Sequence, residues 1–255
     1  MLVDSESRQL QILGVAREQG RVEVAVLAHS LDVAAETIRR DIRMLVDRGL
    51  LRRVHGGAIA VETAGFESDV HYRSNAHATQ KRRIAAAAVN LLHAAETVYI
   101  DEGFTPRLVA DELTRSGQTL TVVTSSLLAA EILADRPHVR TLLIGGRLRG
   151  RTKAMVDDWA LRMLSEFVID LAFMGANGIS RDGLTTPDPA VAAVKREAIV
   201  RSRRRVLVAV HAKFGVSSFV RFAEARDFEA IVTGTELTTT DARRYEALGP
   251  RVIRA

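Results

Sequence analysis

Arginine side chains within residues 33–58 occur at a spacing that could recognise DNA. If residues 37–48 form a helix, Ile38, Ile42 and Leu45 lie together on its apolar face, because residues three, four and seven positions apart share a helix face. The polar side chains then occupy the opposite face or its flank: Glu36, Thr37, Arg39, Arg40, Arg43 and Asp47. A guanidinium group forms paired hydrogen bonds with phosphate or with the acceptor edge of guanine. We therefore predict that this face enters a DNA major groove, with contacts from Thr37, Arg39, Arg40 and Arg43.

A glycine turn follows this helix at the position of the wing in a winged helix. Residues 50–54 and 58–61 have the apolar character of strands, and His55, Gly56 and Gly57 separate them. We expect a positive φ in this turn, where only glycine avoids strain. The turn, with Arg53 before it, is predicted to contact the DNA backbone or the minor groove.

Two further helices are predicted before this unit. Apolar residues recur at helical spacing in Ser5–Gln19 and again in residues 24–31, and residues 32–34 would form the turn that follows. Each part also has an ordinary structural interpretation, because a charged helix face is usually only solvated and a glycine pair is usually a simple hairpin turn. The ordered combination of all the parts favours DNA binding.

The composition indicates a globular protein with an anionic partner. The chain has 255 residues, of which 47% are hydrophobic, and a formal net charge of +5. Arginine supplies 32 of the 36 basic residues, which suits phosphate binding but would also result from genomic codon bias. Between Glu36 and Gly57, six arginines accompany three carboxylates, so the excess of positive charge is local and modest.

Several other classes of protein are excluded by the sequence. The absence of cysteine excludes disulfides and thiolate metal sites, and no apolar run approaches the roughly 18 residues of a membrane span. The first ten residues include Asp4 and Glu6 and do not resemble a signal peptide, so we expect a cytoplasmic protein without membrane contact. The histidines lack metal-ligand spacing beside carboxylates, and His71 and His77 are more simply explained as solvated. Neither a metal nor a cofactor is predicted.

A second pattern begins after residues 62–76, which have mixed polarity and are predicted to link a domain of residues 1–61 to one of residues 77–255. It opens with a predicted helix at residues 81–93. The predicted strands are 98–101, 120–124, 139–144, 169–174, 206–210 and 230–233, and the predicted helices are 106–115, 127–134, 158–167, 189–201 and 240–248. Apolar strands that alternate with helices are typical of an open α/β fold with a parallel sheet covered on both faces.

Small residues, hydroxyls and cations follow several of these predicted strands, in the segments 101–105, 124–126, 145–147, 175–178 and 211–213. Parallel sheets bind ligands at the carboxyl ends of their strands, and a helix that starts there presents free N–H groups to an anion. We therefore predict a small anionic ligand at this edge. The candidate residues are Asp101, Gly103, Thr105, Thr124, Ser125, Gly145, Gly146, Arg147, Gly175 and Lys213.

Both halves of the chain resemble the DeoR family of bacterial repressors. The resemblance rests on residues 37–41, 49–51 and 53–58 in the first half. In the second half it rests on Lys81, residues 84–85, Asp101, Gly103, Thr105, residues 122–124, 145–146 and 172–173, Gly175, residues 178–179 and 183–185, Lys195 and residues 213–215. It implies an N-terminal winged helix-turn-helix and a sensor domain similar in fold to ribose-5-phosphate isomerase. It also adds Lys195 to the candidate effector residues, although Lys195 could instead be a solvent-exposed helix residue.

The resemblance further implies how such a protein works. We expect it to bind a double-stranded DNA operator, to repress a sugar or carbon catabolic operon, and to release the DNA when a sugar phosphate or related metabolite binds. We expect a homodimer or a homotetramer.

The chain departs from the family pattern at several positions. Ala34 replaces a serine that could cap the recognition helix, so we expect a frayed helix start. In the second half the departures are Phe104, Pro106, Ser125, Asp157, Val191 and His211. Val191 and His211 replace acidic residues, whereas Asp157 adds a carboxylate. This carboxylate would repel a phosphate unless an arginine at 147, 149 or 151 neutralises it; alternatively it points outward and caps the helix that follows.

Two other functions stay open. An isomerase needs a carboxylate base beside a group that polarises the carbonyl, and Asp101, Glu102, Asp182 and Asp188 lie in suitable loops. Val191, however, removes the expected acidic partner of Lys195, so we predict no enzymatic activity. The other possibility is a constitutive DNA binder with a degenerate sensor domain, which titration of the DNA complex with metabolites would distinguish.

Overall fold

The computed structural model describes residues 5–48, 50–61 and 77–255. It divides the chain into two compact units, one up to Ala76 and the other from His77 to Ala255. The segment predicted as a linker, residues 62–76, lies outside the described residues. The two units are described separately below.

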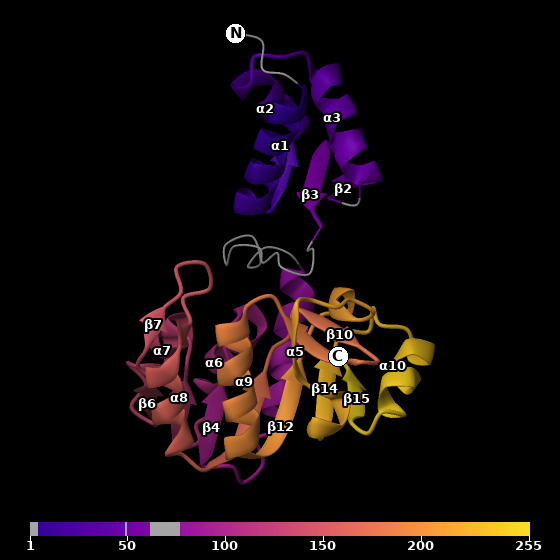
Figure 1. Ribbon diagram of the computed structural model, residues 1–255. Helices are drawn as coiled ribbons and strands as arrows, with labels where there is room; N and C mark the ends of the chain where they lie inside the picture. Colours follow the sequence, from indigo (N-terminus) through magenta and orange to yellow (C-terminus); the bar gives the residue numbers. More distant parts are fainter. Residues whose placement is uncertain (1–4, 49, 62–76) are drawn as a thin grey trace. The chain divides into compact units, whose positions relative to one another are not determined.

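In its described residues, the first unit has three helices and a small antiparallel sheet (Figure 1). The helices are α1 (Ser5–Gln19), α2 (Val24–Ser30) and α3 (Ala35–Asp47), and the strands are β1 (Arg21–Glu23), β2 (Leu51–Val54) and β3 (Gly57–Ala60). The strand order is β1-β3-β2. Ile12, Ile38 and Leu45 form the centre of its core. This is a winged helix, as the sequence predicted, with β1 as a strand that the periodicity did not reveal.

The second unit contains a parallel sheet of seven strands in the order β15-β14-β12-β9-β4-β5-β6. These strands are β4 (Thr97–Ile100), β5 (Leu120–Thr124), β6 (Val139–Leu143), β9 (Ile169–Met174), β12 (Ser202–Val208), β14 (Ala230–Thr233) and β15 (Arg251–Arg254). The expected open α/β fold with a parallel sheet is confirmed.

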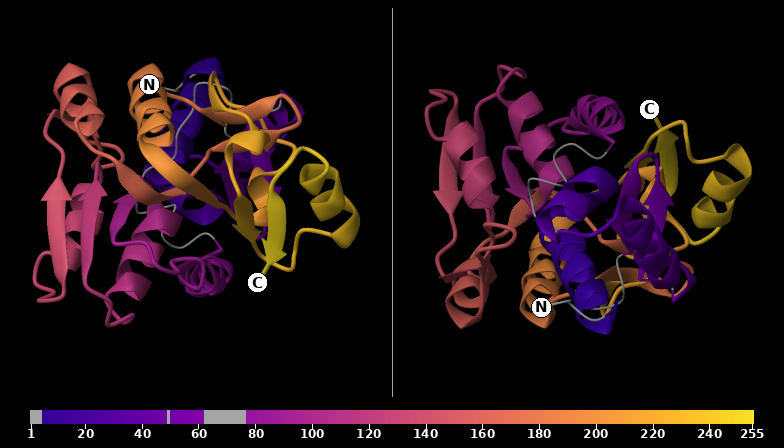
Figure 2. Two further views of the ribbon diagram at one scale, coloured as in Figure 1. Left: turned by 90° about the horizontal axis from the view of Figure 1, so that it is seen from below. Right: turned by 90° about the horizontal axis from the view of Figure 1, so that it is seen from above.

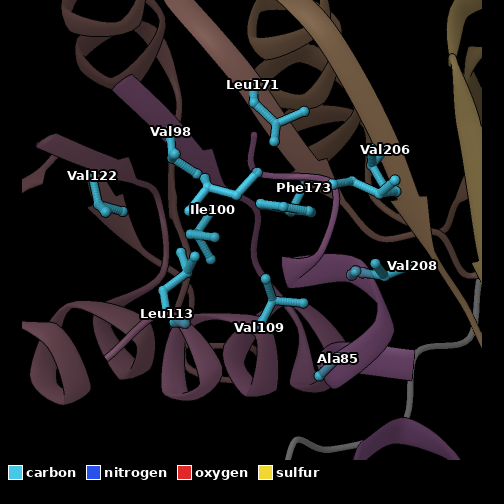
Figure 3. Packing of buried hydrophobic residues seen from close by; sticks show 14 of the residues in the cluster. Ala85, Val98, Ile100, Val109, Leu113, Val122, Leu171, Phe173, Val206 and Val208 are labelled. Carbon is cyan, nitrogen blue, oxygen red and sulfur yellow. The ribbon is translucent and has the colours of Figure 1, made fainter. Parts of the chain in front are cut away.

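Helices cover both faces of this sheet (Figure 2). On one face lie α5 (Ala78–Val89), α6 (Phe104–Leu113) and α7 (Leu127–Leu133); on the other lie α8 (Asp158–Ser165), α9 (Pro189–Arg201) and α10 (Thr239–Glu246). Neighbouring strand residues alternate between the two cores, since successive side chains point to opposite faces. Figure 3 shows Val98, Ile100 and Phe173 in the first core, and Tyr99 lies in the second.

Two smaller sheets complete the second unit. One is the antiparallel set β10 (Gly178–Ser180), β11 (Gly183–Thr186) and β13 (Val220–Ala223), and the other is the pair β7 (Arg147–Leu148) and β8 (Met155–Val156). Short helical turns span His211–Lys213 and Ala225–Asp227. The small sheets and β15 were not predicted, and β12 begins four residues earlier than expected.

Candidate DNA-binding and effector sites

Helix α3 is fixed on α1 by a buried carboxylate as well as by its apolar face. Asp41 is 2% exposed and accepts hydrogen bonds from Arg8 Nε at 2.6 Å, Gln9 Nε2 at 3.2 Å and Ser5 Oγ at 3.3 Å. A buried carboxylate is tolerated only where donors satisfy its oxygens. Asp41 therefore has a structural role, and it sets the orientation of the arginines beside it in the sequence.

The outward face of α3 carries the predicted arginines. Arg39, Arg40 and Arg43 are exposed, and Glu36 pairs with Arg39 at 3.1 Å and with Arg43 at 4.0 Å. Within the part of the chain that the structure describes, Arg40 makes no ion pair. Exposed pairs of this kind contribute little to stability, so a phosphate could replace Glu36 as the partner of either arginine.

The start of α3 has no side-chain cap. The helix begins at Ala35, and the Ala34 carbonyl accepts hydrogen bonds from the N–H groups of Thr37 at 2.9 Å and Ile38 at 3.3 Å. Backbone bonding thus closes the first turn where a capping serine is missing. Thr37 is half-buried on this turn.

The wing differs from the predicted turn in one respect. Gly56 has a positive φ of 75°, but Gly57 does not and is the first residue of β3. A Cβ atom on Gly57 would lie 1.8 Å from the Val22 carbonyl oxygen. The expectation that Gly57 is needed for the turn conformation is therefore wrong. Gly57 instead allows β1 and β3 to approach each other, because a side chain there would meet the Val22 carbonyl.

Residues of β1 and α2 hold the wing tip in place. The Val24 N–H donates to the Gly56 carbonyl at 3.0 Å, and Arg21 Nη2 donates to the His55 carbonyl at 3.2 Å. Arg53 and His55 are exposed. The wing therefore presents a cation and an imidazole from a fixed backbone.

In the second unit, a buried ionic cluster lies at the carboxyl end of the parallel sheet. Lys195 of α9 is 1% exposed and pairs with Asp101, which follows β4. Its ammonium group also donates to the Gly175 carbonyl after β9 at 3.2 Å and lies 3.6 Å from Glu102 Oε1. The alternative of a solvent-exposed Lys195 is thus wrong, and so is the expectation that Val191 leaves Lys195 without an acidic partner.

Burial determines the electrostatics of this cluster. Desolvation raises the pKa of Asp101, while the charge of Lys195 and the Gly175 N–H, which donates to Asp101 Oδ2 at 2.8 Å, act in the opposite direction. Burial also raises the pKa of Tyr99, whose hydroxyl lies 2.9 Å from Ser125 Oγ. The cluster thus holds ionisable groups in a region with little water.

A narrow pocket, too small in this structure to admit a water molecule, lies beside the cluster. Its lining residues are Asp101, Glu102, Ser125, Ala154, Met155, Val156, Val191 and Val194. The structure therefore brings the predicted residues Asp101 and Ser125 together at this pocket, with Gly175 and Lys195 directly behind Asp101. Glu102 was considered only as a possible catalytic base, and its place in the pocket follows from its position directly after Asp101.

Other predicted effector residues lie at the same strand ends but do not line this pocket. Thr124 Oγ1 donates to the Ile100 carbonyl at 2.6 Å, Gly103 precedes α6 with a φ of 112°, and Thr105 is buried in the first turn of α6. Lys213 lies on the short helical turn after β12. These residues lie at the predicted edge of the sheet, but the structure does not bring them together on one binding surface.

The predicted residues Gly145, Gly146 and Arg147 belong to the segment around β7 and β8. Gly146 has a φ of 130°, and a Cβ atom there would lie 2.4 Å from the Val156 carbonyl oxygen. The Gly145 N–H points to Met163 Sδ at 3.0 Å. Arg149, from the same segment, pairs with Asp188 at the start of α9 at 3.0 Å, and residues 154–156 of this segment form one wall of the pocket.

Phe104 lies near two cations at the start of α6. The Lys81 ammonium is 5.2 Å and the Arg107 guanidinium 4.8 Å from its ring centroid, both within cation–π range. The first turn of a helix is a natural anion site, but Pro106 removes one N–H group here. Phe104 therefore engages the cations that an anion at this position would use.

Among the described residues, no group of three or more His, Asp or Glu side chains could hold a metal ion. No helix in the same residues is long and apolar enough to cross a membrane.

Comparison with known proteins identifies both units. Residues 8–64 match the model of the DeoR-like helix-turn-helix domain, and residues 76–235 match the model of the DeoR C terminal sensor domain. A winged helix joined to a sensor domain defines a DNA-binding regulator that responds to a ligand. The chain belongs to the DeoR family of transcriptional regulators, which confirms the resemblance seen in its sequence.

Relatives along nearly the whole chain are transcriptional regulators. The chain is 34% identical over 247 residues to the HTH-type transcriptional regulator GlpR of Haloferax volcanii, covering 96% of each protein. It is 32% identical over 223 residues to the glycerol-3-phosphate regulon repressor of Escherichia coli, covering 87% of this chain and 88% of the relative. Among solved structures, ribose 5-phosphate isomerase A of Methanocaldococcus jannaschii is 16% identical with a TM-score of 0.41, covering 55% of each chain.

Proposed function

We propose that the protein is a repressor of a sugar or carbon catabolic operon. It binds a specific operator through α3 and the wing, and a small phosphorylated metabolite at the strand ends of the sensor sheet releases it. The observation that carries this proposal is the exposed arginine face of α3, fixed from behind by the buried Asp41. Relatives named as a glycerol-3-phosphate regulon repressor and a lactose phosphotransferase system repressor support the class of operon.

The residues proposed for DNA contact are divided between two roles. Arg40, which has no ion pair within the described residues, is proposed to read a base, and such a contact contributes about 1–3 kcal/mol of discrimination. Arg39, Arg43, Arg53 and the wing tip at His55 and Gly56 are proposed to position the protein on the phosphate backbone. A homodimer or homotetramer would place two such units on one operator.

Fluorescence anisotropy on operator and random duplexes at fixed salt tests the DNA interface. Replacing Arg39, Arg40 and Arg43 together by alanine should abolish the preference for the operator. Replacing Arg203, Arg226 and Arg244, whose side chains are 72%, 73% and 68% exposed on the sensor domain, removes the same charge and should leave the preference unchanged. Equal behaviour of the two triple variants would show that α3 does not read DNA.

The single variant Arg40→Ala separates the two roles. Loss of a base contact should reduce operator binding by about 1–3 kcal/mol and relax specificity at one position. Loss of a phosphate contact should instead weaken binding to all DNA sequences alike, and the salt dependence of binding should fall by about one released counterion. Titration of the operator complex with sugar phosphates and glycerol 3-phosphate then tests release.

A further inference from the structure

Two buried carboxylate oxygens beside the pocket at the strand ends have no hydrogen-bond donor among the described residues. Glu102 is 4% exposed and Asp101 is 1% exposed. Glu102 Oε2 and Asp101 Oδ1 are both buried, and neither has a hydrogen-bond partner among the described residues. Buried acceptors are usually satisfied, and leaving one without a donor lowers the stability of the fold. The orphaned oxygens therefore call for an explanation beyond packing.

The cluster also contains one carboxylate more than its cation can balance. Asp101 pairs with Lys195 and accepts the Gly175 N–H through Oδ2, so its charge is balanced although its Oδ1 has no donor among the described residues. Glu102 approaches the same ammonium only through Oε1 at 3.6 Å, beyond normal hydrogen-bond length. Among the described residues, the Lys195 ammonium thus faces two buried carboxylates, and Glu102 is the surplus one.

The surplus carboxylate borders the pocket rather than the closed core. Asp101 and Glu102 line one side together with Ser125, and the other lining residues are Ala154, Met155, Val156, Val191 and Val194. The apolar side offers no donor to Glu102, and Ser125 Oγ is engaged with the Tyr99 hydroxyl at 2.9 Å. The pocket is too small for a molecule to enter without moving its lining. A molecule that widened it would meet acceptors on one wall and apolar atoms on the other.

We propose that Glu102 is a specificity-determining residue of the effector site, and that Glu102 Oε2 and Asp101 Oδ1 accept hydrogen bonds from a donor group of the effector. This inference rests on the proposed function and states which end of the effector lies here. Two carboxylates repel a phosphate, so the phosphate points elsewhere and the opposite end, bearing hydroxyls or an ammonium group, meets Glu102. Either donor group satisfies the oxygens, and the ammonium would also balance the surplus charge.

Thermal unfolding of the full chain without ligand gives the first test. Glu102→Leu removes the surplus charge and leaves the Asp101–Lys195 pair intact, so the melting temperature of the sensor domain should rise by several degrees. Glu131→Leu, on the exposed surface of α7, is the matched control and should not raise it. A fall in melting temperature for Glu102→Leu would mean that Glu102 is a structural partner of Lys195, and it would overturn the inference while operator binding stays as proposed.

Ligand binding gives the second test. Glucose 6-phosphate and glucosamine 6-phosphate differ by one hydroxyl or ammonium group, and they are titrated calorimetrically beside glycerol 3-phosphate and fructose 6-phosphate. For every compound that binds the wild type, Glu102→Leu should lower the affinity at least tenfold. If the ammonium group lies at Glu102, Glu102→Gln should lower the affinity for glucosamine 6-phosphate about tenfold. The affinities for the compounds that carry only hydroxyl groups should change less than about threefold. Unchanged affinities in Glu102→Leu would overturn the inference; if the wild type binds none of these compounds, the melting experiment alone decides.

Discussion

The Arg147 guanidinium lies 2.6 Å from the Asp157 carboxylate, and both side chains are largely exposed, at 61% and 42%. Asp157 precedes α8 but makes no capping hydrogen bond with its side chain. The interpretation of Asp157 as a helix cap is therefore wrong. The pair is instead one of the alternatives considered from the sequence, in which an arginine neutralises the Asp157 carboxylate. The hydrogen bond and charge of Asp157 raise the pKa of Arg147.

The backbone at Asp157 leads to the first prediction. Its φ of 76° and ψ of −171° lie in a region that is normally restricted to glycine. Asp157→Gly should therefore stabilise the sensor domain by about 1–2 kcal/mol, since the exposed ion pair that it removes contributes little. Chemical denaturation measures the change, and Arg147→Ala, which removes the same ion pair without changing the backbone, is the control. Equal stability changes in the two variants would contradict the strain argument. Sugar-phosphate affinity should change little, because Asp157 does not line the pocket.

The second prediction concerns the two glycines of the wing. Gly57→Val should disrupt the pairing of β1 with β3 and unfold the DNA-binding domain, because the new side chain would meet the Val22 carbonyl. Gly56→Ala places its Cβ in open space but keeps a positive φ, so it should cost about 1–2 kcal/mol. Limited proteolysis and thermal melting of the two domains distinguish the variants. A folded first domain in Gly57→Val would show that the β1–β3 approach is not required.

The sequence predicted the elements whose own pattern is strong. Strands β5, β9 and β14 and helix α9 have the predicted bounds, because each is rich in apolar residues and is bounded by polar or turn-forming residues. Strands β1, β10 and β13 have at most four residues, and their pairing depends on partners distant in the sequence. Periodicity alone cannot reveal such strands.

The candidate site was predictable in part for the same reason. The carboxyl ends of parallel strands meet at one edge, so the neighbourhood of Asp101, Ser125 and Gly175 follows from the order of elements. The burial of Lys195 does not, because a lysine on a helix is ordinarily exposed, and only the packing of α9 on the sheet places it beside Asp101. The role of Glu102 depends in turn on that placement.

The third prediction is that the protein does not isomerise ribose 5-phosphate. Such a reaction needs a cation or donor that polarises the carbonyl beside a free base. Lys195 is directed to Asp101 and to the Gly175 carbonyl and does not line the pocket, and Val191 and Val194 form an apolar wall. Protein purified from a host without its own isomerase should convert ribose 5-phosphate at a rate far below about 1 s⁻¹. Turnover at or above that rate, lost in Glu102→Gln, would instead identify an enzyme.

The last prediction concerns Phe104, whose ring engages Lys81 and Arg107 at the start of α6. Phe104→Ser frees both cations from the ring and adds a hydroxyl donor at the first turn of a helix, where an anion is favoured. We expect affinity for sugar phosphates and for inorganic phosphate to increase about tenfold, equivalent to about 1.4 kcal/mol. Calorimetric titration of both variants measures the change. The control is Phe219→Ser, which alters an aromatic side chain that is 66% exposed elsewhere on the domain and should bind like the wild type. Weaker binding in Phe104→Ser alone would show that the ring itself contacts the effector, and that the anion is held by other groups at the strand ends.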